Sequence, residues 1–187
     1  MPNPKNNRAM TTKTLAYCAL LAALSVVLAR LIIPMPNVTT RFSIEAVPIY
    51  LAGMLFGPMA GGLVGFSADL VGCLFSGYGY NPLFCVPPIL YGVFGGLLRG
   101  WLGSKPGLPK LAAGFLPPVI LGSILCQSAA LSYVYNSKGS FQASLVYFLS
   151  TRTVQFAVTL VLDVLIIYLL LKTGVFERMG IRKTKEM

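Results

Sequence analysis

The feature that most constrains this chain is how little charge it carries. Only 11% of its 187 residues are charged, 56% are hydrophobic, and the mean hydropathy is +0.75. A soluble domain carries about 25% charged residues, so there is too little charge here to cover a water-exposed surface. Lipid must therefore cover much of the protein, and the length suits one membrane domain over residues 1–187 rather than two.

Proline and glycine divide the chain into six apolar segments, each of which we expect to form a helix. A helix needs roughly 20 apolar residues to cross the hydrocarbon core of a bilayer; the second segment is shorter than this and the sixth is longer. The expected helices are at about 12–33, 43–56, 59–75, 83–102, 111–135 and 141–171. The predicted fold class is an all-α membrane protein, a compact bundle of six transmembrane helices, with tails at 1–11 and 174–187.

The distribution of basic residues predicts the orientation of this bundle. With both the N and C termini in the cytoplasm, 11 of the 15 Lys and Arg residues fall on the inner side, as the excess of positive charge in cytoplasmic loops requires. The four on the outer side are Arg30, Arg41, Lys138 and Arg152. The net charge of +10 is thus explained by orientation, and no basic groove with interleaved aromatics points to nucleic acid.

Glycines recur at four-residue steps in the middle of the chain. The two series are Gly53, Gly57, Gly61 and Gly65, and Gly92, Gly96 and Gly100. Small residues at this spacing let helix backbones approach closely in lipid. We expect close helix packing at these positions, with no chemistry implied.

The arginines on the outer side are the first candidates for a binding site. Arg30 and Arg152 lie inside or at the edge of apolar segments, and Arg41 lies in the first outer connection. Charge inside a membrane is costly and usually faces a cavity or a partner, and guanidinium groups bind carboxylates in a bidentate manner. The alternative is that these arginines reach to lipid headgroups or pair with Glu45.

Acidic residues are equally sparse, and one of them lies midway along a predicted helix. Asp69 either accepts paired N–H bonds from a heterocyclic amine or neutralises an arginine. Asp163 lies closer to the cytoplasmic side, where we expect a structural polar contact. Glu45, at the start of the second helix, favours a helix N-terminus.

Polar aromatic residues gather in the glycine-rich outer loop at 76–82. Tyr78, Tyr80 and Asn81 either form part of an interfacial aromatic belt or close over a flat, anionic ligand. Gln127 and Ser128, deeper in the fifth helix, place an amide and a hydroxyl group at the depth of such a pocket.

Several kinds of chemistry have no support in the sequence. There is no histidine, and the four cysteines form no CxxC pair, so metal-ligand spacing is missing. We interpret the cysteines as small apolar helix residues, with a Cys73–Cys85 disulfide across the outer loop as the less favoured alternative. No phosphate-binding GxxxxGK[ST] loop is present, and no catalytic base or carboxylate pair stands out. The chain is not expected to be an enzyme or to carry a cofactor or metal.

Three stretches carry a resemblance to a known family. They are YCALLAALSVVLAR in the first helix, RFSIEAVPIYLAGMLFGPMAGGLVGFSADLVG followed by NPLFCVPPILYGVFGGLLRG in the centre, and FLSTRTVQF, which contains Arg152 and Gln155, in the sixth helix. Together they resemble the substrate-binding S components of energy-coupling-factor (ECF) vitamin transporters, most closely the folate-specific branch. One departure lies in the fifth helix, where Gln127-Ser128-Ala129-Ala130 replaces a stretch expected to be similar to Asn-Thr-Trp.

The resemblance implies a division of labour. An S component in the plasma membrane of a prokaryote binds a vitamin in an outward-facing pocket and delivers it by toppling in the membrane. A transmembrane coupling subunit docks on small alanines of the first helix, here Ala16, Ala19 and Ala23, and two cytoplasmic ATPase subunits supply the energy. Folate matches the candidate residues, because its pterin ring suits Asp69 and its two carboxylates suit Arg30, Arg41 or Arg152. The alternatives are another vitamin such as biotin or pantothenate, or a stand-alone carrier or channel.

Overall fold

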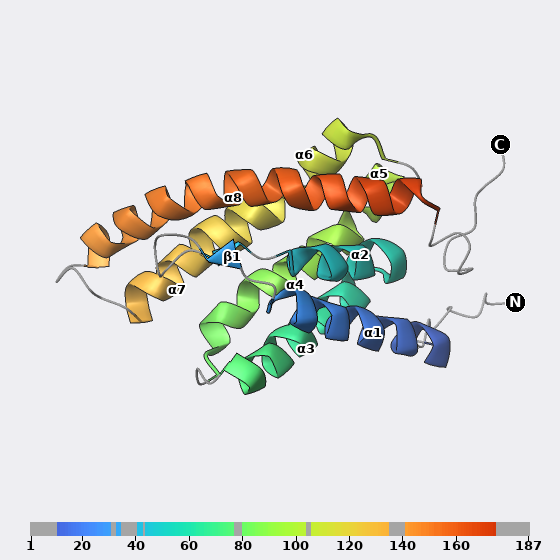
Figure 1. Ribbon diagram of the computed structural model, residues 1–187, viewed down its shortest axis with the longest axis horizontal. Helices are drawn as coiled ribbons and strands as arrows, with labels where there is room; N and C mark the ends of the chain where they lie inside the picture. The colour runs from blue at the N-terminus through green and yellow to red at the C-terminus, as the bar shows by residue number, and fades with distance from the viewer. Residues whose placement is uncertain are drawn as a thin grey trace, which may run out of the picture.

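A computed structural model describes residues 11–30, 33–34, 41–42, 44–76, 80–103, 106–134 and 141–174. These residues form a helical bundle with one short pair of strands (Figure 1). The elements are α1 Thr12–Leu28, β1 Ile33–Pro34, β2 Arg41–Phe42, α2 Ala46–Phe56, α3 Pro58–Ser76, α4 Pro82–Leu97, α5 Arg99–Leu102, α6 Leu108–Pro118, the π-helix η1 Val119–Cys126, α7 Gln127–Val134 and α8 Phe141–Lys172.

The helical class predicted from the sequence is confirmed, and each of the six apolar segments contains helix. Within the described residues, three helical stretches are long and apolar enough to cross a membrane: Pro58–Phe75, Leu108–Val134 and Phe141–Lys172. Three further apolar helices, α1, α2 and α4, are shorter than a full span. Six crossings remain a prediction.

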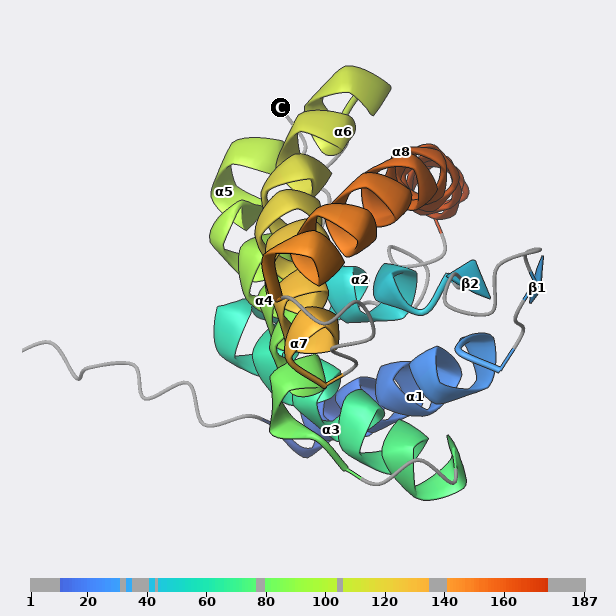
Figure 2. The same cartoon turned by 90° about the vertical axis from the view of Figure 1, so that its left-hand side faces the viewer.

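Some boundaries differ from the sequence prediction. The first helix ends at Leu28 rather than near residue 33, and the fourth segment breaks between Leu97 and Arg99 into α4 and α5. The pair β1–β2 was not predicted; its strands run antiparallel, with Ile33 opposite Phe42 and Pro34 opposite Arg41. Figure 2 shows both strands on the side of the molecule from which α2 begins.

The start of α1 and the end of α8 lie at the same end of the bundle (Figure 1). The end of α7 and the start of α8 lie at the opposite end, as do the end of α3 and the start of α4. This arrangement suits an even number of crossings, with the start of α1 and the end of α8 on one side of the membrane. Which side that is rests on the distribution of basic residues.

Glycines bring α2, α3 and α4 into backbone contact. A side chain added at Gly61 or at Gly53 would collide with the carbonyl oxygen of Gly92, and one added at Gly65 would collide with the carbonyl oxygen of Pro88. A side chain added at Gly96 would meet the backbone of Pro58. The predicted close packing is therefore found at these positions, and it makes α2–α3–α4 the most tightly joined part of the molecule. It is not found at Gly57 or Gly100, where an added side chain would meet nothing within 4 Å.

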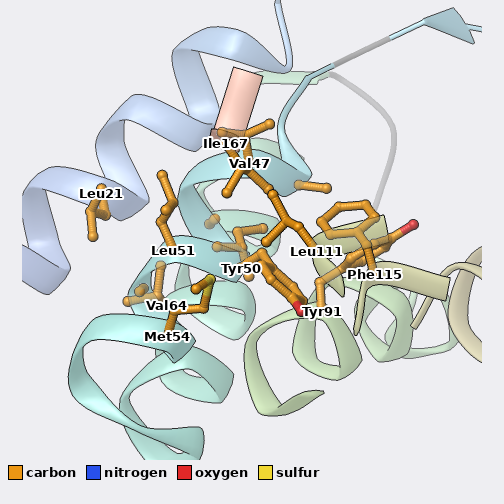
Figure 3. Close-up of a cluster of buried hydrophobic side chains, with 14 of the residues drawn as sticks. Leu21, Val47, Tyr50, Leu51, Met54, Val64, Tyr91, Leu111, Phe115 and Ile167 are labelled. Carbon is orange, nitrogen blue, oxygen red and sulfur yellow. The ribbon is translucent and has the colours of Figure 1, made fainter. Parts of the chain in front are cut away.

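The apolar core extends between α1, α2, α3, α4, α6 and α8 (Figure 3). Tyr50 has no exposed surface, and its ring centroid lies 4.7 Å from that of Phe115, which in turn lies 5.3 Å from that of Tyr91. Ile167 of α8, also fully buried, reaches the same cluster. Aromatic contacts of this kind contribute about 0.5–1.5 kcal/mol each beyond the burial of their area, so they hold α6 against α2 and α4, and the burial of Ile167 adds α8 to the same core.

A π-helical stretch interrupts the fifth apolar segment. Pro117 and Pro118 end α6, because proline has no N–H to continue the hydrogen-bond ladder, and η1 follows directly. This stretch places the Ser123 hydroxyl 2.8 Å from the Tyr91 hydroxyl of α4, in the interior. π-Helical turns frequently occur at functional sites, and the helices around η1 are α4, α6, α7 and α8.

Candidate functional site

A cavity of about 210 Å³ lies between α1, α2, α3 and α4, with polar and charged residues in its wall. Its lining consists of Ser25, Val26, Ala29, Arg30, Glu45, Ile49, Ala68, Asp69, Gly72, Cys73 and Pro88. An engineered cavity of about 150 Å³ takes up a benzene ring, whereas pockets for drug-sized ligands measure about 300–1,000 Å³. The cavity therefore accommodates one ring system but not a whole vitamin with a long tail.

Arg30 lies at the edge of this cavity and spans from α1 to α3. Its Nη2 atom donates a hydrogen bond to the backbone oxygen of Gly72, at 2.8 Å. Gly72 is in the last turn of α3, where carbonyl groups carry the negative end of the helix dipole. An exposed guanidinium group at this position stabilises the end of α3, so the structure gives Arg30 a structural contact within the predicted site.

Asp69 lies on the opposite wall and faces α4. Its side chain hydrogen-bonds with Cys85, which also hydrogen-bonds with Tyr80. The Oδ2 atom of Asp69 is buried and has no hydrogen-bond partner among the described residues. A buried carboxylate oxygen without a donor is uncommon in native proteins, and it marks Asp69 as the acceptor in this cavity that is most in need of a ligand or a water molecule.

The cysteines near Asp69 are thiols and not a disulfide. Gly65 packs on Pro88, and Gly61 on Gly92, so antiparallel pairing places Asp69 opposite Cys85. Cys73 then lies about one helical turn from the level of Cys85. The less favoured disulfide considered from the sequence is absent from this structure.

Two residues of the outer loop fall within the described part of the chain. Asn81 caps α4: its Oδ1 atom accepts a hydrogen bond from the backbone N–H of Leu83, at 3.1 Å, and Pro82 follows at the first helical position. Tyr80 is 46% exposed. Tyr78, the third predicted loop residue, lies outside the described residues.

A second polar region lies on the buried face of α8. Its buried residues recur every three or four positions and include Ser144, Arg152, Gln155, Thr159 and Asp163, which places them on one face of the helix. Arg152 is 8% exposed and Gln155 6%. The Arg152 guanidinium carbon lies 5.8 Å from the centre of the Phe156 ring.

Arg152 and Asp163 do not form an ion pair with each other. Eleven residues separate them on one continuous helix, which corresponds to about 16 Å along the axis. Asp163 is 2% exposed, and its Oδ1 atom has no hydrogen-bond partner within the described ranges. The two buried charges therefore mark separate positions along α8.

The polar face of α8 packs against η1 and α7. Ser128 is fully buried on α7, and its hydroxyl lacks a partner in the described part of the chain; Gln127 is half-buried beside it. Ser144 of α8 is likewise fully buried, with no hydroxyl partner among the described residues. Hydroxyl groups in such positions require water or a ligand.

The structure therefore divides the predicted site residues between two places. Arg30 and Asp69 share the cavity between α1 and α4, whereas Gln127, Ser128, Arg152 and Gln155 belong to the packed helices α7 and α8. Arg41 lies in β2, where the structure places its backbone beside Pro34. The sequence did not predict three further residues of these regions, Cys85, Ser144 and Thr159. For Ser144 and Thr159, the regular spacing of polar residues in the sixth apolar segment could have indicated their place.

The predicted docking alanines all lie on the outer surface. Ala16, Ala19 and Ala23 are exposed, whereas Cys18 and Ser25 of the same helix are buried. Their side chains are therefore not buried against the other described helices, and docking on them stays a prediction. An exposed row of small residues allows another helix to approach closely in lipid.

Comparison with known proteins gives a consistent family and fold. A family model described as "ECF-type riboflavin transporter, S component" matches residues 9–173. Among solved structures, FolT bound with folic acid is similar with a TM-score of 0.72 and 25% sequence identity, covering 87% of this chain and 95% of that one. No curated protein sequence matches the chain.

Two further solved structures share the fold. ThiT from Listeria monocytogenes has a TM-score of 0.65 and 19% identity, with coverage of 87% of this chain and 94% of that one. An S-component for biotin from an ECF-type ABC transporter has a TM-score of 0.57 and 23% identity, with coverage of 91% and 98%.

Proposed function

The chain belongs to the ECF-type riboflavin transporter S component family and is therefore a membrane S component of a vitamin transporter; we propose that its vitamin is folate. The family is one of integral plasma membrane proteins and of transporters, not of enzymes. Uptake then needs the energising module, which comprises a transmembrane coupling subunit and two cytoplasmic ATPase subunits. In this proposal the chain binds folate from outside and delivers it by toppling as a whole.

The observation that carries the choice of folate is the burial of Arg152. Its side chain is 8% exposed in an apolar helix, and an ionisable group at such a position is by default a functional residue. Guanidinium groups bind carboxylates with two parallel hydrogen bonds. Folate carries two carboxylates on its glutamate tail, whereas the flavin ring and ribityl chain of riboflavin carry none.

The likeness to FolT bound with folic acid supports the same choice. Riboflavin is the second candidate, because the matching family model is described by that vitamin. A flavin needs stacking surfaces and neutral hydrogen-bond partners more than it needs a buried cation. Biotin, with a single carboxylate, remains a third candidate.

We assign the two ends of folate to the two polar regions. Asp69, with its unsatisfied Oδ2 atom, accepts the paired N–H groups of the pterin ring in the 210 Å³ cavity. Arg152 receives a tail carboxylate, with Gln155, Gln127 and Ser128 supplying neutral hydrogen bonds. The loop residues Tyr78, Tyr80 and Asn81, together with Arg41, cover the ligand from the outside, and Arg30 holds the end of α3 in place.

Calorimetry on the purified protein tests this function. Folate should bind with one-to-one stoichiometry, and Arg152→Ala should weaken the binding at least about tenfold, because loss of one partner of a buried charge pair typically costs 2–5 kcal/mol. Arg99→Gln, which removes an exposed arginine at the opposite end, serves as the control and should leave affinity unchanged. Tight binding of riboflavin without binding of folate would leave the family assignment intact and overturn the choice of vitamin.

A further inference from the structure

A basic and aromatic patch lies at the end of the bundle away from the proposed vitamin site. It consists of Arg99 and Trp101 on α5 and of Lys110 in the first turns of α6. All three side chains are exposed, Trp101 at 51%. Figure 1 shows α5 and the start of α6 toward the same end as the start of α1 and the end of α8.

The break between α4 and α5 creates this patch. Leu102 turns into the core, where it is 2% exposed and lies 3.2 Å from the position that a side chain at Gly114 would occupy. On a helix, Leu102 and Trp101 point in different directions, so anchoring of Leu102 directs Trp101 outward. The patch is therefore held by the core and does not depend on a loose loop.

Lys110 and Trp101 are arranged as a pair. The Lys110 ammonium group lies 5.4 Å from the centre of the Trp101 ring, within the range of a cation–π contact. This contact positions the charge beside the ring and leaves N–H donors of the ammonium group available. Arg99 adds a second cation from the same short helix.

The protein supplies no anion for these cations in its described residues. The three carboxylates there are placed elsewhere: Glu45 and Asp69 line the cavity, and Asp163 is buried in α8. The patch joins two apolar helices, α4 and the span Leu108–Val134, so it lies at the depth of the lipid headgroups. Tryptophan prefers this depth, and anionic lipids attract basic groups there.

We propose that this patch, Arg99, Trp101 and Lys110, binds the phosphate of an anionic phospholipid in the leaflet that the basic residues assign to the cytoplasm. The bound lipid holds one corner of the bundle at the membrane surface. The site is separate from the vitamin site and is independent of which vitamin is carried.

Trp101 is the only tryptophan of the chain, so its fluorescence reports on this patch alone. The full-length protein is reconstituted in lipid vesicles that contain a minor fraction of lipid brominated near the top of its acyl chains. Brominated phosphatidylglycerol should quench Trp101 more strongly than equally brominated phosphatidylcholine. In the double variant Arg99→Gln/Lys110→Gln this difference should disappear, and each single variant should require about fivefold more phosphatidylglycerol for the same quenching.

Lys13→Gln is the matched control, since Lys13 is an exposed basic residue at the same end of the bundle, on α1. Its preference for phosphatidylglycerol should equal that of the unaltered protein. The melting temperature of each variant checks that it is folded. Equal quenching by the two lipids in the unaltered protein would overturn the proposal, and so would an undiminished preference in the double variant. Loss of binding to the coupling module, with lipid preference unchanged, would assign the patch to a protein partner instead.

Discussion

Arg30 and Arg152 look alike in the sequence, since both are arginines near the predicted outer ends of apolar segments, but the fold places them differently. Arg30 is exposed and donates to the last turn of α3 at Gly72. Arg152 is buried on α8, a helix that packs against η1 and α7, and it lies close to the ring of Phe156 on the same helix. An ionisable side chain buried in an apolar helix is by default a functional residue, and Arg152 is therefore the stronger candidate for contact with a carboxylate.

Asp69 allows the two ends of the proposed ligand to be tested separately. Asp69→Asn replaces one of two acceptor oxygens with a donor, which opposes the paired N–H groups of a pterin ring. Folate affinity should fall roughly tenfold to a hundredfold, as expected for a hydrogen bond to a charged group. Calorimetry with pteroic acid, which lacks the glutamate tail, is the comparison.

The loss caused by Asp69→Asn should be the same for folate and for pteroic acid. Arg152→Ala, in contrast, should weaken folate more than pteroic acid. If Asp69→Asn leaves both affinities unchanged while Arg152→Ala still weakens folate, the pterin ring lies elsewhere and the assignment of the cavity is wrong.

The sequence predicted which residue types form the polar regions, but not how they are grouped. Helical spacing cannot show that Arg30 and Arg152 belong to different regions, because this depends on how α1, α3 and α8 pack. Nor could it show that Asn81 caps α4, since Asn serves equally well in loops and in ligand contacts. The sequence departs from the family pattern at Gln127-Ser128, and these residues lie at the start of α7. This helix packs against α8, which carries Arg152, so both residues can still supply polar groups there.

At the scale of elements, the glycine series could be predicted because its physical cause is local. Four-residue spacing places small residues on one side of a helix whatever the partner. The break at Leu98, the π-helix η1 and the pair β1–β2 could not be predicted from spacing. They depend on tertiary contacts such as Leu102 in the core and Ser123 against Tyr91.

Gly92 gives the sharpest test of this packing. In Gly92→Ala the new methyl group would meet the backbone of Gly61 and, at 2.8 Å, the nitrogen of Gly62. We expect a loss of stability of about 1–3 kcal/mol, as for other overpacked sites. A thermal unfolding series in detergent measures it. Gly100, which continues the same four-residue series, has nothing within 4 Å of an added side chain.

Gly100→Ala should therefore leave the melting temperature unchanged or raise it, because alanine favours helix over glycine by up to about 1 kcal/mol. The two substitutions are chemically identical, so opposite signs isolate the packing effect. A melting temperature of Gly92→Ala equal to that of the unaltered protein would show that α3 and α4 are not in backbone contact.

The exposed alanine row of α1 is the element that we assign to docking. Ala19→Trp should abolish co-purification with the coupling subunit, because a bulky ring prevents close approach of a partner helix, while folate affinity stays as it was. Ala157→Trp is the control: Ala157 is exposed on α8, away from α1. Equal co-purification of both variants with the coupling subunit would show that the docking surface does not include these alanines.

At the scale of the whole molecule, the fold class and the membrane setting followed from composition alone, because 11% charged residues leave few other solutions. The sequence contains no phosphate-binding loop, and the family to which the chain belongs is that of an S component, one part of a transporter. The vitamin could not be read from composition, since related folds are found for FolT and for an S-component for biotin. It depends on a few side chains such as Arg152 and Asp69.

The choice of folate is best tested by identifying the ligand that stays bound to the protein during purification. The full-length protein is purified from cells grown in medium that supplies folate, riboflavin and biotin together, then denatured, and the released small molecules are identified by mass spectrometry. We predict a folate in near one-to-one amount, and its loss from Arg152→Ala but not from Arg99→Gln. Release of riboflavin or biotin, with no folate, would show that folate is not the vitamin this protein binds.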